Sequence, residues 1–340
     1  MQSTQVYAVN KNNGPGGLAV RTTDVPAPAA GEVRVRVEAA GVSYGDLLFQ
    51  RGVVPGGPKP PFVPGCDLTG VVESVGDGVT GIQPGQRVTA LVVSGGYASV
   101  RNLPSERVVP VPDDLDPVRV AAATLNYFIA YQMLHRVARV GTGQRIMVHG
   151  ASGGVGLAFL QLAEHIGGVR VWGSASAANL DLVRRHGATP IDYRTQDFVQ
   201  VVRAAGGNLD AVFDHIGGTH FWRSYRVLRR GGHMIAYGQN DVVRPDGRTN
   251  MLIGGIGFLG GIVAPKLLPD GKKTVFYNAW ALEKSQPAAY RADLTELLGL
   301  LAADKIAPRS ITTMPLDKAE DAFRALEKGV TGKIVLDCTA

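Results

Sequence analysis

The sequence predicts an α/β protein that combines a β-rich domain with a domain built on a doubly wound parallel sheet. Its 340 residues are enough for two domains, each with its own core. The N-terminal part carries short alternating or β-branched runs separated by Gly and Pro, which is typical of antiparallel strands. The later part alternates short apolar runs with helical segments, which predicts βαβ units.

The β-rich part begins with a clear strand. Residues 32–38 alternate strictly between apolar and polar side chains, as a strand with one buried face does. Further β-branched runs at 71–75 and 87–93 are separated by turns rich in Gly and Pro. The segment 53–61 holds so many Pro and Gly residues that it cannot form regular structure. We expect it to form a loop over the cleft.

The pattern changes near Val118, where a predicted helix over 121–137 precedes the alternating region. A C-terminal helix over 290–303 and a strand over 333–336 are expected to rejoin the β-rich domain. The predicted domains are therefore 1–122 with 288–340, and 123–287. In the second domain we expect a strand at 146–148 and a helix through 155–166. Strands and helices are then expected to alternate over 169–172, 180–186, 190–192, 198–204, 211–213, 221–228 and 233–237.

The segment 145–157 carries the most functional information. A short strand runs directly into a glycine cluster, and an apolar helix follows. Ala151, Gly153 and Gly156 occupy the three small positions of a dinucleotide fingerprint, with Gly154 and Val155 between them. Small residues there allow a tight turn, close approach of a pyrophosphate, and close packing of helix on strand. The cluster predicts a nucleotide site; a glycine-rich turn without a ligand is the alternative.

The residues after the second strand of this domain indicate which nucleotide is bound. An NAD site has an acidic residue there that accepts hydrogen bonds from the ribose hydroxyls, whereas this chain has Ser174 and Ser176. Hydroxyl side chains leave room for a 2′-phosphate, and Tyr193 and Arg194 could add a phenol and a guanidinium. We therefore predict NADPH. The alternative is that these serines are ordinary turn residues.

Composition excludes several classes of protein. The net charge of +6 and the pI near 9.3 come from arginines that are scattered along the sequence, so we expect a solvated surface and no nucleic-acid partner. The sequence contains no run of 18 apolar residues, so we expect no membrane span, and its N-terminus does not resemble a signal peptide. Two cysteines cannot build a disulfide framework, so we expect a cytoplasmic protein.

Taken together, these residues resemble the medium-chain dehydrogenase/reductase superfamily over essentially the whole chain. In that superfamily a GroES-like β domain carries the substrate side and a Rossmann domain carries NAD(P). The resemblance therefore implies a GroES-like domain followed by a Rossmann domain. The segments that carry it are 40–46, 64–72, 85–88, 126–131, the glycine fingerprint, 213–218 and 332–336.

The resemblance also bears on metal content. Zinc enzymes of the superfamily place Cys and then His-Glu around a catalytic zinc, where this chain has Ser43 and Cys66-Asp67. A catalytic zinc needs three protein ligands and an open position. The cysteines of a structural zinc lobe are missing, and the seven histidines are dispersed along the sequence without ligand spacing. We predict an enzyme without metal.

A zinc-free member resembles the quinone oxidoreductase (zeta-crystallin-like) branch, which implies hydride transfer from NADPH to a quinone or an α,β-unsaturated carbonyl. One alternative is an NADPH-binding protein with little turnover, serving a structural, regulatory or RNA-binding role. Another is an enoyl thioester reductase, although the segment 50–55 lacks the tyrosine that some of those enzymes carry.

The resemblance supplies candidate residues in the first domain. Tyr44 and Asn126 are the candidate catalytic residues; Tyr44 could donate to a substrate oxygen or only pack beside the cleft. Ser43 is expected near the nicotinamide ribose, and Lys333 is expected among the cofactor residues. Asp46 is expected to be a structural hydrogen-bond acceptor rather than a base.

Further cofactor residues are expected in the second domain. Gly217, Tyr237, Gly238 and Gln239 follow its fourth and fifth strands, and ligands of such sheets bind at the carboxyl ends of strands. Asn179 stands near the position where relatives often have a lysine for the 2′-phosphate.

The segment 251–263 is apolar and rich in glycine, and we expect it to form a turn and a core strand. Its position matches the segment through which relatives pair their Rossmann sheets. We therefore expect a homodimer that pairs at this edge.

Overall fold

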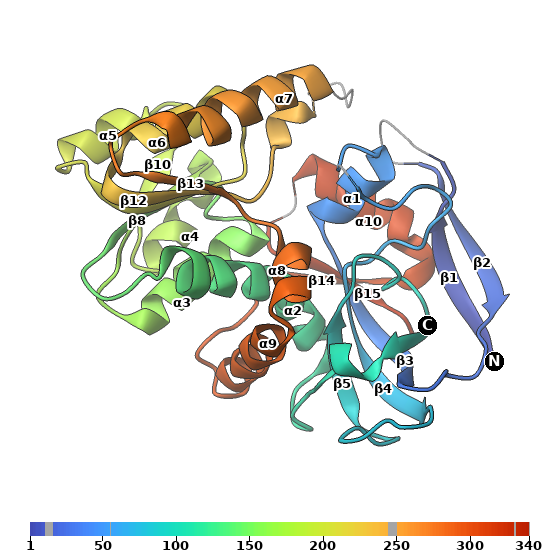
Figure 1. The fold of residues 1–340 in the computed structure, drawn as a ribbon. Helices are drawn as coiled ribbons and strands as arrows, with labels where there is room; N and C mark the ends of the chain where they lie inside the picture. Colours follow the sequence, from blue (N-terminus) through green and yellow to red (C-terminus); the bar gives the residue numbers. More distant parts are fainter. Residues whose placement is uncertain (11–15, 55, 244–249, 330, 340) are drawn as a thin grey trace. The chain divides into compact units, whose positions relative to one another are not determined.

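The computed structural model describes residues 1–10, 16–54, 56–243, 250–329 and 331–339, so Pro55 of the expected 53–61 loop lies outside the described residues. The described chain divides into two compact units (Figure 1). Unit 1 consists of residues 1–128 and 283–340, and unit 2 of residues 129–282.

Unit 1 is the β-rich part. A seven-stranded sheet has the order β14-β15-β3-β4-β5-β7, with β6 also paired to β3, and β1 pairs with β2 in a separate hairpin. The alternation predicted for residues 32–38 is confirmed, because Val33, Val35 and Val37 are fully buried in the core. The strands are β1 (Gln2–Ala8), β2 (Leu18–Asp24), β3 (Glu32–Val42), β4 (Asp67–Val75), β5 (Arg87–Leu91), β6 (Val100–Pro104), β7 (Val109–Pro110), β14 (Ile311–Pro315) and β15 (Lys333–Asp337).

The helices of unit 1 pack their apolar residues onto this core. Leu47 and Phe323 are fully buried in the same cluster as the sheet residues. The helix predicted over 121–137 is α2 (Pro117–Tyr131), which continues as a π-helical turn, η2 (Gln132–Ala138), and it contains the boundary between the two units. The other helices are α1 (Tyr44–Arg51), α9 (Pro287–Ala302) and α10 (Ala319–Lys328), and α8 (Ala279–Ser285) spans the second boundary between the units.

Unit 2 contains the predicted parallel sheet. Its six strands have the order β10-β9-β8-β11-β12-β13, and every neighbouring pair is parallel. This is the doubly wound dinucleotide-binding order, in which the direction of winding reverses between β8 and β11. The strands are β8 (Arg145–Val148), β9 (Arg170–Ala175), β10 (Thr189–Asp192), β11 (Leu209–Asp214), β12 (Leu228–Ala236) and β13 (Lys273–Phe276).

The helices of unit 2 cover both faces of this sheet, as the alternating pattern predicts. Figure 1 shows α3 (Gly154–Ile166) and α4 (Leu180–Arg185) on one face, and α5 (Phe198–Ala204), α6 (Thr219–Arg226) and α7 (Met251–Phe258) on the other. Within the described ranges, none of the helices has both the length and the apolar character that crossing a membrane requires.

The strand expected within residues 251–263 is wrong. The segment forms α7 and a π-helical extension, η5 (Leu259–Val263). A Cβ added at Gly257 would lie 2.6 Å from Gly218 Cα, and one at Gly261 would lie 2.4 Å from Phe221 Cβ. These glycines recur at helical spacing and form the face that packs closely on α6, so their spacing was the helix signal. The apolar composition alone could not distinguish the two structures.

Candidate functional site

The carboxyl ends of β8 and β11 form the point of unit 2 where the sheet order reverses. Open α/β sheets bind ligands at such a point. Val148, the last residue of β8, pairs with Phe213 of β11. The glycine cluster therefore follows β8 at the reversal point.

The turn after β8 depends on two glycines. Gly150 has a φ of 64°, and a Cβ there would lie 2.3 Å from His215 Nε2. A Cβ at Gly156 would lie 2.2 Å from the Gly150 carbonyl oxygen, so α3 could not begin so close to the turn with a larger residue. Ala151 is fully buried, and its N–H donates to the Ser174 carbonyl oxygen at 2.8 Å. Close packing of helix on strand is the role expected of Gly156.

The N-terminus of α3 is open to an anion. Gly153 is the N-cap residue, no side chain caps the helix, and its first turn contains no acidic residue. The N–H groups at the start of a helix lack partners within it and carry a partial positive charge. The Gly153 N–H donates to the Gly150 carbonyl oxygen at 3.0 Å, so it closes the turn instead. Gly154, Val155 and Gly156 therefore present the donors that fit a pyrophosphate.

Ser174 is placed differently from the expectation of a phosphate ligand. Its side chain is buried, and its Oγ accepts from the Gly150 N–H at 3.2 Å and lies 3.2 Å from His149 Nδ1. The hydroxyl is thus used inside the protein, where it holds the glycine turn against the end of β9.

The other residues expected at the 2′-phosphate lie on two neighbouring strand ends. Asn179 Nδ2 donates to Ser176 Oγ at 3.3 Å in the turn after β9. The Tyr193 N–H donates to the Ala175 carbonyl oxygen at 3.2 Å, which joins the turn after β10 to the same edge. Tyr193 is exposed, and the guanidinium carbon of Arg194 lies 5.6 Å from its ring centroid. The structure therefore brings these side chains to adjacent strand ends.

The residues expected at the nicotinamide end follow β11 and β12. The Tyr237 N–H donates to the Asp214 carbonyl oxygen at 3.0 Å, and the Tyr237 hydroxyl is buried without a partner among the described residues. Burial also raises the pKa of this phenol. Gln239 is committed elsewhere, because its Nε2 donates to the Gly254 carbonyl oxygen in α7 at 2.6 Å.

Glycines shape the same end. Gly217 has a φ of 102°, and a Cβ there would lie 2.1 Å from Asp241 Oδ1. Gly238 packs on His215, whose Cβ would lie 3.1 Å from a Cβ at that position.

A buried polar network, which the sequence reading missed, lies beneath the glycine turn. His149 Nε2 lies 3.2 Å from Ser224 Oγ, and Ser224 donates to Asp214 Oδ2 at 2.6 Å. His220 Nδ1 lies 2.8 Å from the same carboxylate oxygen. Because Ser224 gives its single proton to Asp214, it must accept from His149, which assigns the imidazole proton to Nε2. His149 Nδ1 is then the acceptor for Ser174.

The network has a defined charge state. Burial lowers the pKa of His149 to about 3, although the charge of Asp214 opposes the change, so this imidazole is neutral. Burial works against ionisation of Asp214, but hydrogen bonds from His220 and Ser224 hold the pKa of this carboxyl well below its ordinary value. A signal was available in the sequence, since His149 and Asp214 each stand at the carboxyl end of a strand.

Although the histidines are dispersed along the sequence, two of them lie close together in the folded chain, so the expectation of no cluster is wrong. Ligand atoms of His149, Asp214 and His220 lie within 4.8 Å of one another. Both nitrogens of His149 are, however, engaged by serine hydroxyls. The hydrogen-bonded network accounts for these side chains as they stand.

In unit 1, Asp46 organises the start of α1. Ser43 caps this helix: its Oγ donates to Asp46 Oδ2 at 2.7 Å and accepts from the Asp46 N–H at 3.2 Å. Tyr97 donates to Asp46 Oδ2 at 3.0 Å, and Gly65 donates its N–H to Oδ1 at 3.1 Å. Asp46 is the structural acceptor that we expected, and the Ser43 hydroxyl is a helix cap.

The two candidate catalytic residues lie on helices of unit 1. Tyr44 is the first residue of α1 and is half-buried; burial raises the pKa of its phenol, and the nearby Arg51 opposes that rise. Asn126 is buried on α2.

Lys333 is buried in unit 1 beside Asp67, at the start of β15. Its Nζ lies 3.8 Å from Asp67 Oδ2, and the Gly41 N–H donates to Asp67 Oδ1 at 2.5 Å. A Cβ at Gly41 would lie 2.6 Å from that carboxylate, so glycine makes the close approach possible. The ammonium expected to contact a cofactor therefore lies against a buried carboxylate.

These residues do not fit a catalytic zinc. Asp67 is held by Lys333 and Gly41, and Ser43 caps α1. Fewer than the three ligands that such a site requires are available at these positions.

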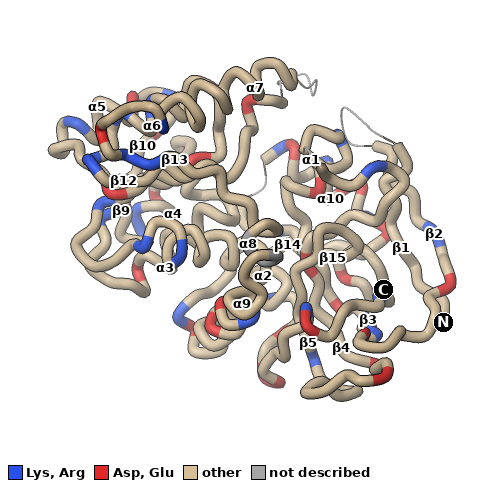
Figure 2. The backbone as a smooth tube through the Cα atoms, in the orientation of Figure 1, with Lys and Arg blue, Asp and Glu red and all other residues tan. Residues whose placement is uncertain are grey.

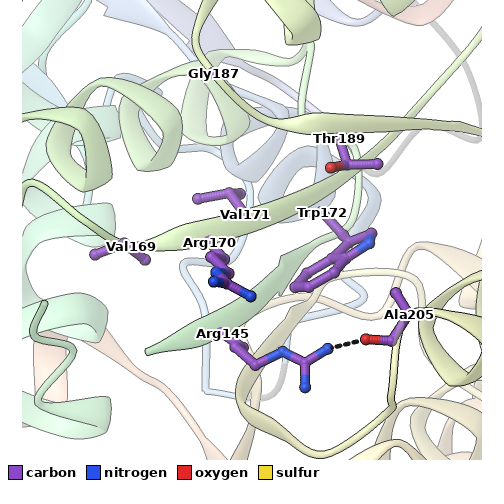
Figure 3. A pocket seen from close by; sticks show the side chains of 8 residues that line it. All are labelled: Arg145, Val169, Arg170, Val171, Trp172, Gly187, Thr189 and Ala205. Carbon is purple, nitrogen blue, oxygen red and sulfur yellow. Dashed lines mark hydrogen bonds between the residues drawn. The ribbon is translucent and has the colours of Figure 1, made fainter. Parts of the chain in front are cut away.

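A separate cavity of about 280 Å³ lies at the opposite edge of the sheet in unit 2 (Figure 3). Arg145, Arg170 and Thr189, which line it, are the first residues of β8, β9 and β10. The Arg145 guanidinium donates to the Ala205 carbonyl oxygen at 2.6 Å and lies 5.2 Å from the Trp172 ring centroid. This cavity is formed by the amino ends of the strands and not by the ends that bear the glycine turn.

Comparison with known protein families gives matches to both parts of the chain. Residues 29–113 match the alcohol dehydrogenase GroES-like domain, and residues 186–336 match the zinc-binding dehydrogenase family. The synaptic vesicle membrane protein VAT-1 homolog of Rattus norvegicus is 32% identical over 323 residues, which are 94% of this chain and 80% of that protein. The homolog of Danio rerio is also 32% identical, and the match covers 92% of this chain but 65% of that protein.

Solved structures agree with these matches. The structure of human synaptic vesicle membrane protein VAT-1 homolog-like protein superposes with a TM-score of 0.81 at 28% identity, covering 99% of this chain and 98% of that one. The structure of Escherichia coli quinone oxidoreductase complexed with NADPH superposes with a TM-score of 0.84 at 25% identity, covering 98% and 99% of the two chains.

Proposed function

Because this chain belongs to the medium-chain dehydrogenase/reductase superfamily, we propose that it is a zinc-independent, NADPH-dependent oxidoreductase. Its acceptor is a quinone or an α,β-unsaturated carbonyl. NADPH supplies a hydride when it is bound, and the protein holds the nicotinamide against the acceptor and excludes water.

The observation that carries this proposal is the edge formed by the ends of β9 and β10. Ser176 follows β9, and Tyr193 and Arg194 follow the neighbouring β10, while no acidic side chain stands at the end of β9 where an NAD site has one. A guanidinium recognises phosphate oxygens through paired hydrogen bonds. Arg194 therefore binds the 2′-phosphate, and the N-terminus of α3 binds the pyrophosphate.

We also propose roles for three residues near the nicotinamide and the acceptor. Tyr237 contributes its backbone to the nicotinamide end, because its hydroxyl is buried from solvent and its ring packs on Phe159 and His215. We assign the proton-donor role to Tyr44, whose half-buried phenol keeps its proton because burial raises its pKa, while the neighbouring Arg51 offsets part of that rise. Asn126 assists in holding the acceptor.

Zinc independence is supported by the buried Asp67–Lys333 pair, since an ammonium beside the carboxylate disfavours a second cation there. Hydride transfer to a quinone or a conjugated C=C bond needs less activation of the acceptor than reduction of a simple ketone does. We also place the protein in the cytoplasm, in keeping with its two buried free cysteines.

The test is NADPH oxidation measured against a panel of quinones, enals, enones and enoyl thioesters. We expect turnover with a quinone or an enone that survives prolonged EDTA treatment. Turnover with enoyl thioesters alone would reassign the enzyme to that class. Tight NADPH binding without turnover on any acceptor would contradict an enzymatic role and favour a cofactor-binding protein.

Arg194→Gln tests the cofactor assignment. Losing the guanidinium should raise the KM for NADPH by about tenfold, because a charge-assisted pair with phosphate is lost, while the KM for NADH stays within about twofold. Arg203→Gln is the matched control, since Arg203 is an exposed arginine of α5 outside the proposed site. An equal change for both cofactors would overturn the role of Arg194.

A further inference from the structure

The amino ends of the strands in unit 2 gather positive charge around a cavity of about 480 Å³. Figure 2 marks several Lys and Arg positions in blue around β9, β12 and β13. The arginines that are scattered along the sequence are therefore clustered in space. Ionisable residues that line the cavity are Arg136, Arg139, Asp210, Arg229, His233 and Lys273.

The sheet topology creates this cluster. His233 of β12 pairs directly with Lys273, the first residue of β13. Arg229 lies near the start of β12, and Arg139 follows η2. Arg139 has a φ of 53°, in the left-handed region that favours glycine, so the chain places a guanidinium where glycine would be less strained.

The cavity lining holds one carboxylate beside Arg139, Arg229 and Lys273, and this carboxylate pairs with Arg229. Its carboxylate, Asp210, accepts from Arg229 Nε at 2.6 Å through one oxygen and from the Arg145 N–H at 2.8 Å through the other. In the described part of the chain, no carboxylate pairs with Arg139 or Lys273. Cations held together without counter-charge attract anions.

The pKa of His233 responds to the positive charges around the cavity. It is half-buried, and burial lowers the pKa of its imidazole, with Lys273, Arg229 and Arg139 lowering it further. The three cations therefore act on one point within the cavity. Asp210 is the acidic group facing it, and its oxygens are already used.

We propose that this basic cavity is a second ligand site of unit 2, which binds the diphosphate or triphosphate group of a small anion. The guanidinium of Arg139 and the ammonium of Lys273 match several phosphate oxygens at once, and Arg229 adds positive charge beside them although its Nε and Nη1 already donate to Asp210 and to the Arg230 carbonyl oxygen. The lining contains no Phe, Tyr or Trp side chain on which a base could stack. The site lies at the amino ends of the strands, whereas the glycine turn lies at the carboxyl ends. It is therefore distinct from the proposed cofactor site.

The experiment is a calorimetric titration of the full chain with inorganic pyrophosphate at low ionic strength, in the presence of saturating NADPH. Pyrophosphate should bind, and the pKa of His233, followed by NMR, should rise toward its ordinary value as an anion offsets the surrounding cations. A parallel titration with ADP identifies the source of the group. Equal affinities indicate the inorganic anion, and tighter ADP binding indicates a nucleotide; both support the site.

Arg139→Gln combined with Lys273→Gln should weaken pyrophosphate binding by about tenfold or more, because charged hydrogen bonds are lost. Arg309→Gln combined with Lys318→Gln removes the same charge from exposed positions of unit 1 and should change the affinity by no more than about twofold. Equal weakening in both variants would show attraction by net charge only and overturn the proposal. Absence of pyrophosphate binding once NADPH is present would assign the binding to the cofactor site and overturn it as well.

Discussion

Tyr44 carries the chemical part of the proposed function. Its phenol is half-buried, and Arg51 opposes the rise in its pKa that burial causes. Tyr44→Phe should lower kcat/KM with an enone by about tenfold or more, because general acid catalysis contributes ~10²–10⁴-fold. A quinone should be less affected, since water can protonate its oxygens. Steady-state kinetics with both acceptors checks this, and unchanged rates with both would leave Tyr44 as a packing residue.

His149 makes the stability of unit 2 dependent on pH. Its pKa is about 3 in the folded protein, against an ordinary value of 6.5, so between these values the unfolded chain binds a proton that the native state does not. Stability should therefore fall as the pH drops from about 6.5 toward 3, with a limiting slope of about 1.4 kcal/mol per pH unit for one proton. The lowered pKa values of His215 and His233 act in the same direction.

Urea unfolding across this pH range measures the effect. His149→Gln keeps a hydrogen-bonding side chain but removes the titrating group, so its stability should depend less steeply on pH than that of the parent protein. Identical pH profiles would show that His149 does not titrate on unfolding.

Helix α1 owes its start to Ser43, which makes a reciprocal capping box with Asp46. Ser43→Ala should lower the free energy of unfolding by about 1 kcal/mol, with an upper range near 2 because the cap is buried. Ser43→Thr keeps the hydroxyl and should recover most of the loss. Chemical denaturation without any cofactor measures this directly, and a role limited to the nicotinamide ribose would leave the stability of the cofactor-free protein unchanged.

Periodicity in the sequence predicted most elements because their spacing reflects one buried face. Residues 32–38 alternate and form a half-buried strand, and the alternating segments after Arg145 form the expected parallel sheet. The segment 251–263 was misread because its glycines, and not its larger side chains, form the packed face. The composition of a segment shows which side chains are apolar, but it does not show which of them pack against another helix or strand.

The candidate site was predictable where one short motif builds it. The turn after β8 and the ends of β9 and β10 follow from local rules about strand ends. The His149–Ser224–Asp214 network could not be predicted in the same way, because His149 lies 75 residues from Ser224 in the sequence and the sheet order brings them together. The burial of Lys333 beside Asp67 and the clustering of Arg139, Arg229 and Lys273 could not be predicted either, because these residues are far apart in the sequence.

The two ends of the strands in unit 2 suit different ligands. Its carboxyl ends carry the glycine turn, a neutral histidine and an open helix N-terminus, which suit a dinucleotide. Its amino ends carry excess cations around two cavities. The two edges are physically separate, so the ligand proposed at the amino ends can bind while the cofactor site is occupied.

An exposed apolar surface on unit 2 predicts how whole molecules associate. Leu252, Ile256, Leu259 and Leu267 are 73%, 62%, 61% and 84% exposed, and we call them the 252–267 surface. They lie on α7, η5 and η6 (Ala264–Leu267), and β13 is the last strand of the sheet on its side. Contiguous exposed apolar side chains beside an open strand edge mark an interface. We expect a homodimer whose twofold axis pairs this surface with its copy.

Sedimentation velocity at several protein concentrations tests this expectation. Leu252→Glu combined with Ile256→Glu places carboxylates in the middle of the 252–267 surface, and the resulting repulsion and desolvation should shift the protein to monomers while the circular dichroism spectrum stays unchanged. Val20→Glu is the matched control, because Val20 is 48% exposed on β2 of unit 1, and this variant should remain dimeric. If the parent chain sediments as a monomer throughout, the 252–267 surface does not join two copies.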